Sequence, residues 1–193
     1  MIKYSNLDIF VIYSSNEGRN DLFEASLPGM DIEHQNPSGF LNAGGGICIY
    51  FDKYINIFYS TNYYVLLYPV CFLTHSLYWL RNEKCDEWFD TNDNYPYDVV
   101  IVYNNELLRI QNVDENNINL SFTLLEERKI KTRRNPYFKD IIINKNDWYN
   151  ATQTALGEYF KVLLEVISYE PNDEKAKILL QYYDVWNKLP KRL

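Results

Sequence analysis

Cysteine and histidine are rare in this chain. Its 193 residues include three cysteines, Cys48, Cys71 and Cys85, with no CxxC pair, and two histidines, His34 and His75. An odd number of scattered cysteines argues against a disulfide scaffold and against a zinc site. Free thiols are typical of a reducing compartment, so we expect a cytoplasmic protein without a bound metal.

Glycine is also scarce, and three of the seven glycines stand together in "NAGGGICIYF", residues 42–51. A P-loop requires GxxxxGK[ST] and a dinucleotide-binding loop requires GxGxxG, each leading into a helix. This stretch meets neither requirement, because a β-patterned segment follows it. We therefore expect the glycines to form a bulge or a tight start to a strand, and we predict no cofactor. The serines lack the GxSxG pattern of a nucleophile elbow.

Residues 54–80 contain no Lys, Arg, Asp or Glu. An apolar run longer than about 18 residues suggests a membrane span. This run is interrupted by polar residues and by Pro69, so we interpret it as a strand followed by a buried helix, with Pro69 in the first turn. His75 then becomes a hydrogen-bonded core residue. The N-terminus lacks the layout of a signal peptide, and we expect no membrane association.

The hydrophobic pattern predicts an α+β fold in a single domain, residues 1–193. We expect an antiparallel β-sheet (a meander) with one buried helix and two C-terminal amphipathic helices packed on it. The predicted strands cover residues 6–14, 46–51, 54–59, 62–68, 97–103, 106–113, 118–125 and 139–144. Residues 15–45 are predicted to be mostly loop, with a short strand near 30–34. The predicted helices cover residues 69–80, 147–169 and 172–189, and the first C-terminal helix is capped near Asn146 or Asp147.

Charge is distributed unevenly along the chain. The net charge is −7, yet residues 83–127 hold eleven acidic and two basic residues, a local charge of −9. A nucleic-acid-binding protein would carry the opposite sign. Acidic and aromatic residues alternate in "CDEWFDTNDNYPYD", which suits an interface with a basic protein, since rings supply buried area and carboxylates supply steering. The predicted contact residues are Asp86, Glu87, Trp88, Asp90, Asp93, Tyr95, Tyr97 and Asp98.

Two neighbouring patterns are interpreted as ordinary surface. Asp90, Asn92 and Asn94 have the first spacings of a calcium loop, but Tyr95 and Ile101 stand where that loop needs Gly and Glu. The basic stretch "RKIKTRR", residues 128–134, is interpreted as a strand end and loop whose charges balance the acidic turn before it.

The chain resembles the immunity proteins of bacterial toxin systems. The resemblance is carried by small size, acidity and an element order in which "SLYWL" precedes an aromatic strand meander and then "NDWYNATQTALGEYF". It implies a non-enzymatic inhibitor that binds and neutralises a basic toxin or nuclease.

Two alternatives stay open. One is a phage or mobile-element anti-defence inhibitor that mimics the charge of nucleic acid. The other is an enzyme with a site near His34, together with Asp31 or Glu33. Neither the partner nor the oligomeric state follows from the sequence.

Overall fold

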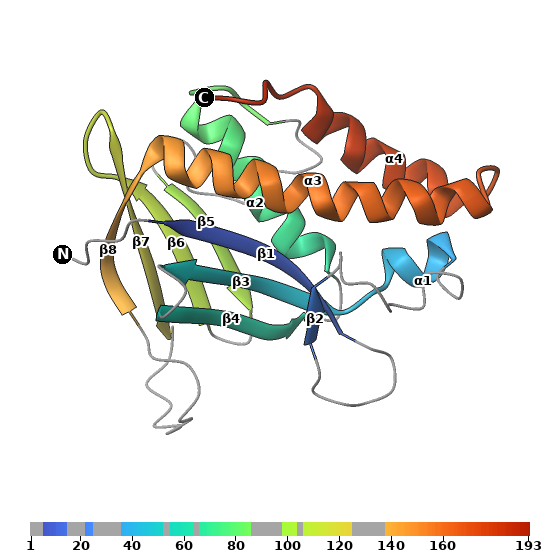
Figure 1. Ribbon diagram of the computed structural model, residues 1–193, viewed down its shortest axis with the longest axis horizontal. Helices are drawn as coiled ribbons and strands as arrows, with labels where there is room; N and C mark the ends of the chain where they lie inside the picture. The colour runs from blue at the N-terminus through green and yellow to red at the C-terminus, as the bar shows by residue number, and fades with distance from the viewer. Residues whose placement is uncertain are drawn as a thin grey trace.

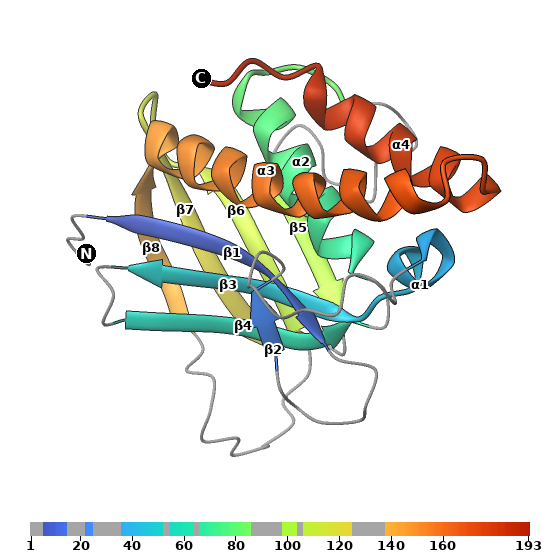
Figure 2. The same cartoon turned by 45° about the vertical axis from the view of Figure 1, so that its right-hand side comes forward.

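The computed structural model describes residues 6–14, 22–24, 36–51, 55–63, 66–85, 98–103, 106–124 and 138–193. The strands of these segments form two four-stranded antiparallel sheets, in the orders β2-β1-β3-β4 and β5-β6-β7-β8. The helices lie together on one side of the two sheets, with the long helix α3 crossing above them (Figures 1 and 2). The predicted α+β class is confirmed, although the strands divide into two sheets.

The first sheet is built around β1 (Leu7–Ser14) and β3 (Gly45–Phe51), with β4 (Ile55–Tyr63) beyond β3. β2 (Leu22–Glu24) pairs only with the last three residues of β1. The predicted strand at 6–14 and the hairpin of β3 and β4 are confirmed. The short strand expected near 30–34 lies outside the described residues.

The glycine stretch turns the chain into β3, as predicted. The register of β3 against β4 shifts between Gly45 and Ile47, which marks a bulge. A β-carbon on Gly45 would overlap the carbonyl oxygen of Ile12 and would lie 2.9 Å from Leu66 Cδ1. Glycine is therefore required for the close approach of β1 to this bulge.

The second sheet is the predicted meander of β5 (Asp98–Tyr103), β6 (Glu106–Asn112), β7 (Asn117–Leu124) and β8 (Phe138–Asn144). The turn between β6 and β7 is organised by Asp114, whose carboxylate accepts hydrogen bonds from the backbone N–H groups of Asn116 and Asn117, both at 2.8 Å. The carbonyl of Asn116 accepts from the N–H of Lys145 at 2.9 Å, so the turn is tied to the start of α3.

One hydrophobic core joins both sheets and the helices. Buried and partly exposed residues alternate at residues 117–122 of β7 and 141–144 of β8, as expected for strands with one face on a core. β3 differs, because six of its seven residues are buried. The core includes Ile9, Val11, Ile47 and Ile49 from the first sheet, Leu108, Ile110, Ile118, Leu120 and Ile143 from the second, and Phe72, Leu73, Trp148, Leu156, Phe160 and Leu163 from the helices.

α2 (Leu67–Leu80) is buried on almost every side, as its uncharged sequence predicts. Pro69 lies in its first turn, where no intrahelical partner is needed for the missing N–H. The strand predicted at 62–68 is wrong in its second half, because β4 ends at Tyr63 and the helix begins at Leu67. The helix ends in a Schellman motif: Asn82 has a positive φ of 56°, Asn82 N–H donates to Trp79 and Glu83 N–H to Tyr78.

Two amphipathic helices follow the second sheet. α3 (Lys145–Tyr169) begins at the cap Asn144, two or three residues before the predicted cap at Asn146 or Asp147, and the Asn144 side chain accepts from the N–H of Asn146. α4 (Glu174–Asn187) begins at the cap Asp173. Trp148, Leu156, Tyr159, Phe160 and Leu163 of the predicted inner face of α3 are buried. A short helix, α1 (Pro37–Leu41), packs beside α3 and α4 within a region predicted to be loop.

None of the helices in the described segments has the length and apolar character that crossing a membrane demands.

Candidate functional site

Asp98 is the member of the predicted contact set that the structure describes. It is the first residue of β5, and its side chain is 8% exposed. Arg109 of β6 places Nε 3.2 Å from Asp98 Oδ2. The charge of Asp98 is therefore compensated within the second sheet, which makes it poorly suited to attract a partner.

The other seven predicted contacts, Asp86, Glu87, Trp88, Asp90, Asp93, Tyr95 and Tyr97, lie outside the described residues, as do His34 and the basic stretch 128–134. The assignments at these positions stay predictions. The two ends of the acidic aromatic stretch (residues 85–98) are described, and both are buried: Cys85 is its first residue and Asp98 its last.

Cys85 belongs to a small cluster that fixes one flank of that stretch. It packs with Cys71 of α2 and Val185 of α4, and Tyr78 and Tyr182 border the cluster. Tyr78 Oη donates to the carbonyl of Val185 at 2.7 Å, which ties α2 to α4 at the same place. Burial raises the pKa of the Cys71 thiol, so this group stays protonated and unreactive at neutral pH.

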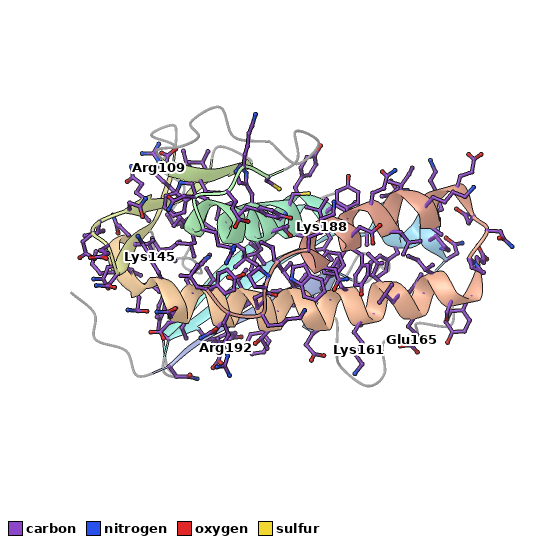
Figure 3. The ribbon with its side chains drawn as sticks, turned by 90° about the horizontal axis from the view of Figure 1, so that it is seen from above. Arg109, Lys145, Lys161, Glu165, Lys188 and Arg192 are labelled. Carbon is purple, nitrogen blue, oxygen red and sulfur yellow. The ribbon has the colours of Figure 1, made fainter. Side chains whose placement is uncertain are left out.

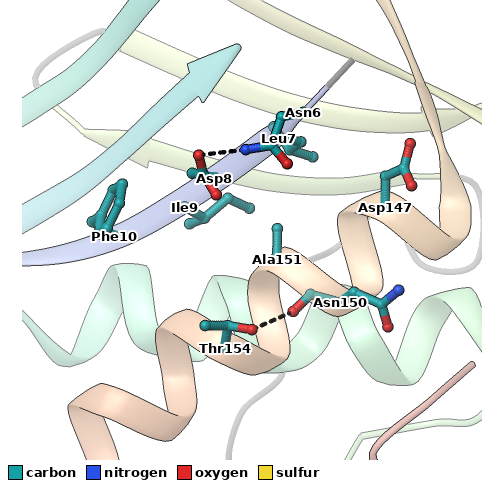
Figure 4. A pocket seen from close by; sticks show the side chains of 9 residues that line it. All are labelled: Asn6, Leu7, Asp8, Ile9, Phe10, Asp147, Asn150, Ala151 and Thr154. Atoms are coloured by element: carbon teal, nitrogen blue, oxygen red, sulfur yellow. Dashed lines mark hydrogen bonds between the residues drawn. The ribbon is translucent and has the colours of Figure 1, made fainter. Parts of the chain in front are cut away.

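A hollow of about 330 Å³ lies between β1 and the first half of α3. Figure 4 shows its two walls: one is the start of β1, with Asn6, Asp8 and Phe10, and the other is α3, with Asp147 and Asn150. The remaining lining residues are Leu7, Ile9, Ala151 and Thr154. The helix contributes positions 147, 150, 151 and 154, which share one face because of the helical period.

The lining of the hollow is polar and acidic. It includes the carboxylates of Asp8 and Asp147, and none of its nine residues is basic. Asn6 Nδ2 donates to Asp8 Oδ2 at 2.8 Å, and Thr154 Oγ1 donates to the backbone carbonyl of Asn150 at 3.0 Å. Asp147 lies in the first turn of α3, where a negative charge is favoured by the helix dipole.

Buried hydrogen bonds hold the helical wall of the hollow in place. On the opposite side of α3, Trp148 Nε1 donates to Ser76 Oγ of α2 at 2.9 Å. Gln153 accepts from Trp186 Nε1 of α4 at 3.0 Å and donates to the carbonyl of Pro190 at the same distance. Because these contacts fix the rotation of α3, the polar face of residues 147–154 stays turned toward β1.

Sequence reasoning missed this hollow. The sequence does contain one signal of it. Asp147, Asn150, Ala151 and Thr154 are spaced so that they form a face of small and polar residues on a helix whose other side is apolar. Strand β1 lies more than 130 residues earlier in the chain, so the pattern does not indicate what this face meets.

The remaining chemical groups of the described residues belong to the core. His75 is 2% exposed in α2, as predicted for a core histidine. All three cysteines are buried, and none of them forms a disulfide. The described segments contain no cluster of His, Cys, Asp and Glu that would hold a metal ion.

No protein-family model, curated protein or solved structure matches the chain.

Proposed function

We propose that this chain is a protein-binding module, an immunity-type inhibitor that acts in the cytoplasm by binding a basic toxin or nuclease. The observation that carries the proposal is the segregation of charge. Residues 145–193, which include α3 and α4, hold seven acidic and seven basic residues. The whole net charge of −7 therefore belongs to residues 1–144, and the densest part of it to residues 83–127. Concentrated carboxylates accelerate association with a basic partner.

Acidic and basic side chains balance one another on the surface of α3 and α4. Figure 3 shows Lys161 and Glu165 together on the outer side of α3, one helical turn apart, where opposite charges attract. Arg109 lies on the far side of the molecule in the second sheet, beside Asp98. Long-range attraction of a basic protein is consequently expected from the segments before α3.

The fixed flanks of the acidic aromatic stretch support its role as the contact segment. Cys85 is anchored between α2 and α4, and Asp98 is anchored in the second sheet. A segment held at both ends loses less conformational freedom on binding than one attached at a single end. Trp88, Tyr95 and Tyr97 would supply the buried anchors, and Asp90 and Asp93 the steering charges.

Capture of the partner tests the proposal. The immobilised chain is exposed to lysate of its native source at low and at high salt. We expect one basic protein to be retained at low salt and released at high salt, since steering charges are screened by ions. The retained protein should have toxic or nuclease activity that falls to zero when one equivalent of the chain is added. A retained protein whose activity is unaffected would refute the inhibitor function.

Exchange of His34 for Ala separates this proposal from the enzyme alternative. An inhibitor with its contacts at residues 86–97 should neutralise its partner equally well with His34→Ala. Loss of the effect in a folded His34→Ala variant would favour a catalytic site at His34 instead.

A further inference from the structure

We propose that Cys71 and Cys85 are a redox-sensitive pair, in which oxidation by a small disulfide such as glutathione disulfide links α2 covalently to the start of the acidic aromatic stretch. The chemistry of the pair does not depend on the proposed function. Its effect on partner binding rests on that function, because Cys85 is where the proposed contact segment begins. Disulfides in cytosolic proteins, where they occur, are usually transient and sense the redox state.

Two of the three cysteines lie in the same small cluster. Cys71 and Cys85 pack with Val185 in a group of buried residues that is separate from the main core, whereas Cys48 lies in β3 of the first sheet. The thiols of the pair are close enough that the charge of Cys85 contributes to the raised pKa of Cys71. A neighbouring thiol within one cluster is the arrangement that an intramolecular disulfide requires.

The end of α2 brings Cys85 back alongside Cys71. Asn82 turns the chain with its positive φ, and the N–H of Glu83 donates to the carbonyl of Tyr78 at 3.0 Å. Tyr78 lies seven residues after Cys71, so both are on one face of the helix, and Tyr78 borders the cluster. The connection from α2 to Cys85 is therefore short and runs back over the face that carries the other cysteine.

Burial keeps the pair reduced until the cluster opens. Cys71 is 7% exposed and Cys85 is 3% exposed. The cluster has only three buried members and is bordered by the partly buried Tyr78 and Tyr182. Opening so small a group costs less free energy than unfolding the whole chain. Local release of the segment at Cys85 is thus the step that admits the oxidant.

The oxidation is a thiol–disulfide exchange in two steps. The Cys85 thiol loses its proton, and its sulfur attacks one sulfur of glutathione disulfide, which releases the first glutathione. Cys71 Sγ then attacks Cys85 Sγ in the mixed disulfide, and its proton leaves with the second glutathione. The two cysteines together lose two electrons and two protons, and one glutathione disulfide becomes two glutathione molecules.

Peptide mapping of the full chain after incubation with glutathione disulfide tests the pair. Trypsin leaves Cys71 in the peptide of residues 54–81 and Cys85 in the peptide of residues 85–109. We expect mass spectrometry to find these two peptides joined by a disulfide that a reductant cleaves. The rate of joining should rise with pH, because the thiolate is the attacking species. Hydrogen exchange of the amides in residues 81–85 should slow in the oxidised chain.

Cysteine variants provide the matched controls. Cys48→Ala should give the same joined peptides, and Cys71→Ala should stop at the mixed disulfide with glutathione on Cys85. The pair is refuted if the folded chain gives no joined peptides, if Cys48 is joined to either cysteine, or if the disulfide forms only in denaturant. None of these measurements needs a partner, so they stand whether or not the capture experiment yields a toxin.

The effect on binding is tested with the captured partner. A covalent link at Cys85 restricts the contact segment before it binds, so less conformational freedom is lost on association. We expect the oxidised chain to bind the partner several-fold more tightly than the reduced chain. Equal affinities of the two forms, with the joined peptides present, would refute the regulatory effect.

Discussion

A methyl group at residue 45 would overlap the carbonyl oxygen of Ile12 and press on Leu66. The carbonyl of Ile12 cannot move without shifting the backbone of β1. We therefore expect Gly45→Ala to lower the free energy of unfolding by about 1–3 kcal/mol, the range for overpacking of a tight site. Chemical denaturation measures this difference.

Gly157 provides the matched control for that substitution. It lies within α3, and a β-carbon there would meet only Trp186, at 3.9 Å. Alanine is the better helix former, so Gly157→Ala should raise stability by about 0.5–1 kcal/mol. Equal effects of the two substitutions would contradict the close approach of β1 to Gly45.

Asp114 illustrates a single carboxylate that organises a turn. Hydrogen bonds from the Asn117 side chain, and then from the Asn116 and Asn117 backbone N–H groups, hold the pKa of Asp114 below its usual value. The stability gained from these bonds is complete above the unfolded-state pKa of about 3.9 and is lost as the pH falls through the lower folded-state pKa. An NMR titration of the carboxyl carbon should give a midpoint below that of an unfolded reference peptide. A midpoint at or above the reference value would show that the hydrogen bonds do not form.

At the scale of elements, α2 and α3 are joined by one buried polar contact. Ser76 Oγ donates to the carbonyl of Leu73 and accepts from Trp148 Nε1. Ser76→Ala should lower the free energy of unfolding by about 1–3 kcal/mol, because the indole N–H stays buried without an acceptor. Thermal or chemical unfolding measures the loss.

Ser168 makes the same local hydrogen bond in an exposed position, from Oγ to the carbonyl of Glu165. Ser168→Ala should therefore change stability by less than about 0.5 kcal/mol. If Ser76→Ala is equally mild, the Trp148 contact does not contribute to the docking of α3.

The elements that the sequence locates well have a regular hydrophobic period or a proline that marks where a helix begins. The alternation in β5–β8, the helical faces of α3 and α4, and Pro69 at the start of α2 each determine local structure strongly. The β-like composition of "YVLLY", residues 64–68, predicts a strand, but the helix extends back to Leu67 and places Pro69 at its third position. An N–H is still unneeded there, since the first turn of a helix leaves these groups unpaired.

At the scale of the whole molecule, local patterns do not show which surfaces meet. The division of the strands into two sheets and the position of α3 along β1 depend on contacts between segments far apart in the chain. The hollow is formed by two such segments, so neither Asp8 nor Asp147 was predicted as a site residue. The acidic neighbourhood of Asp98 predicts it as a contact residue. Its ion-pair partner Arg109, which lies diagonally across from it on β6, follows only from the register of β5 on β6.

The segregation of charge should be measurable in the rate at which the chain associates with a basic protein. The neutral helical layer and the acidic segments before it differ in the attraction that they exert on a basic protein. Removing carboxylates from residues 86–97 should therefore change the encounter rate, while removing the same number from α3 should not.

The most direct test is the association rate constant with the captured partner as a function of salt. Stopped-flow mixing compares the unmodified chain, Asp90→Asn, Asp93→Asn and the control Glu165→Gln, Glu170→Gln. We predict that association of the Asp90, Asp93 variant is slowed several-fold at low salt, by about 3–10-fold, with a flatter salt dependence. The control should follow the unmodified chain. Equal rates and equal salt slopes for all three proteins would contradict the claim that the acidic aromatic stretch steers a basic partner.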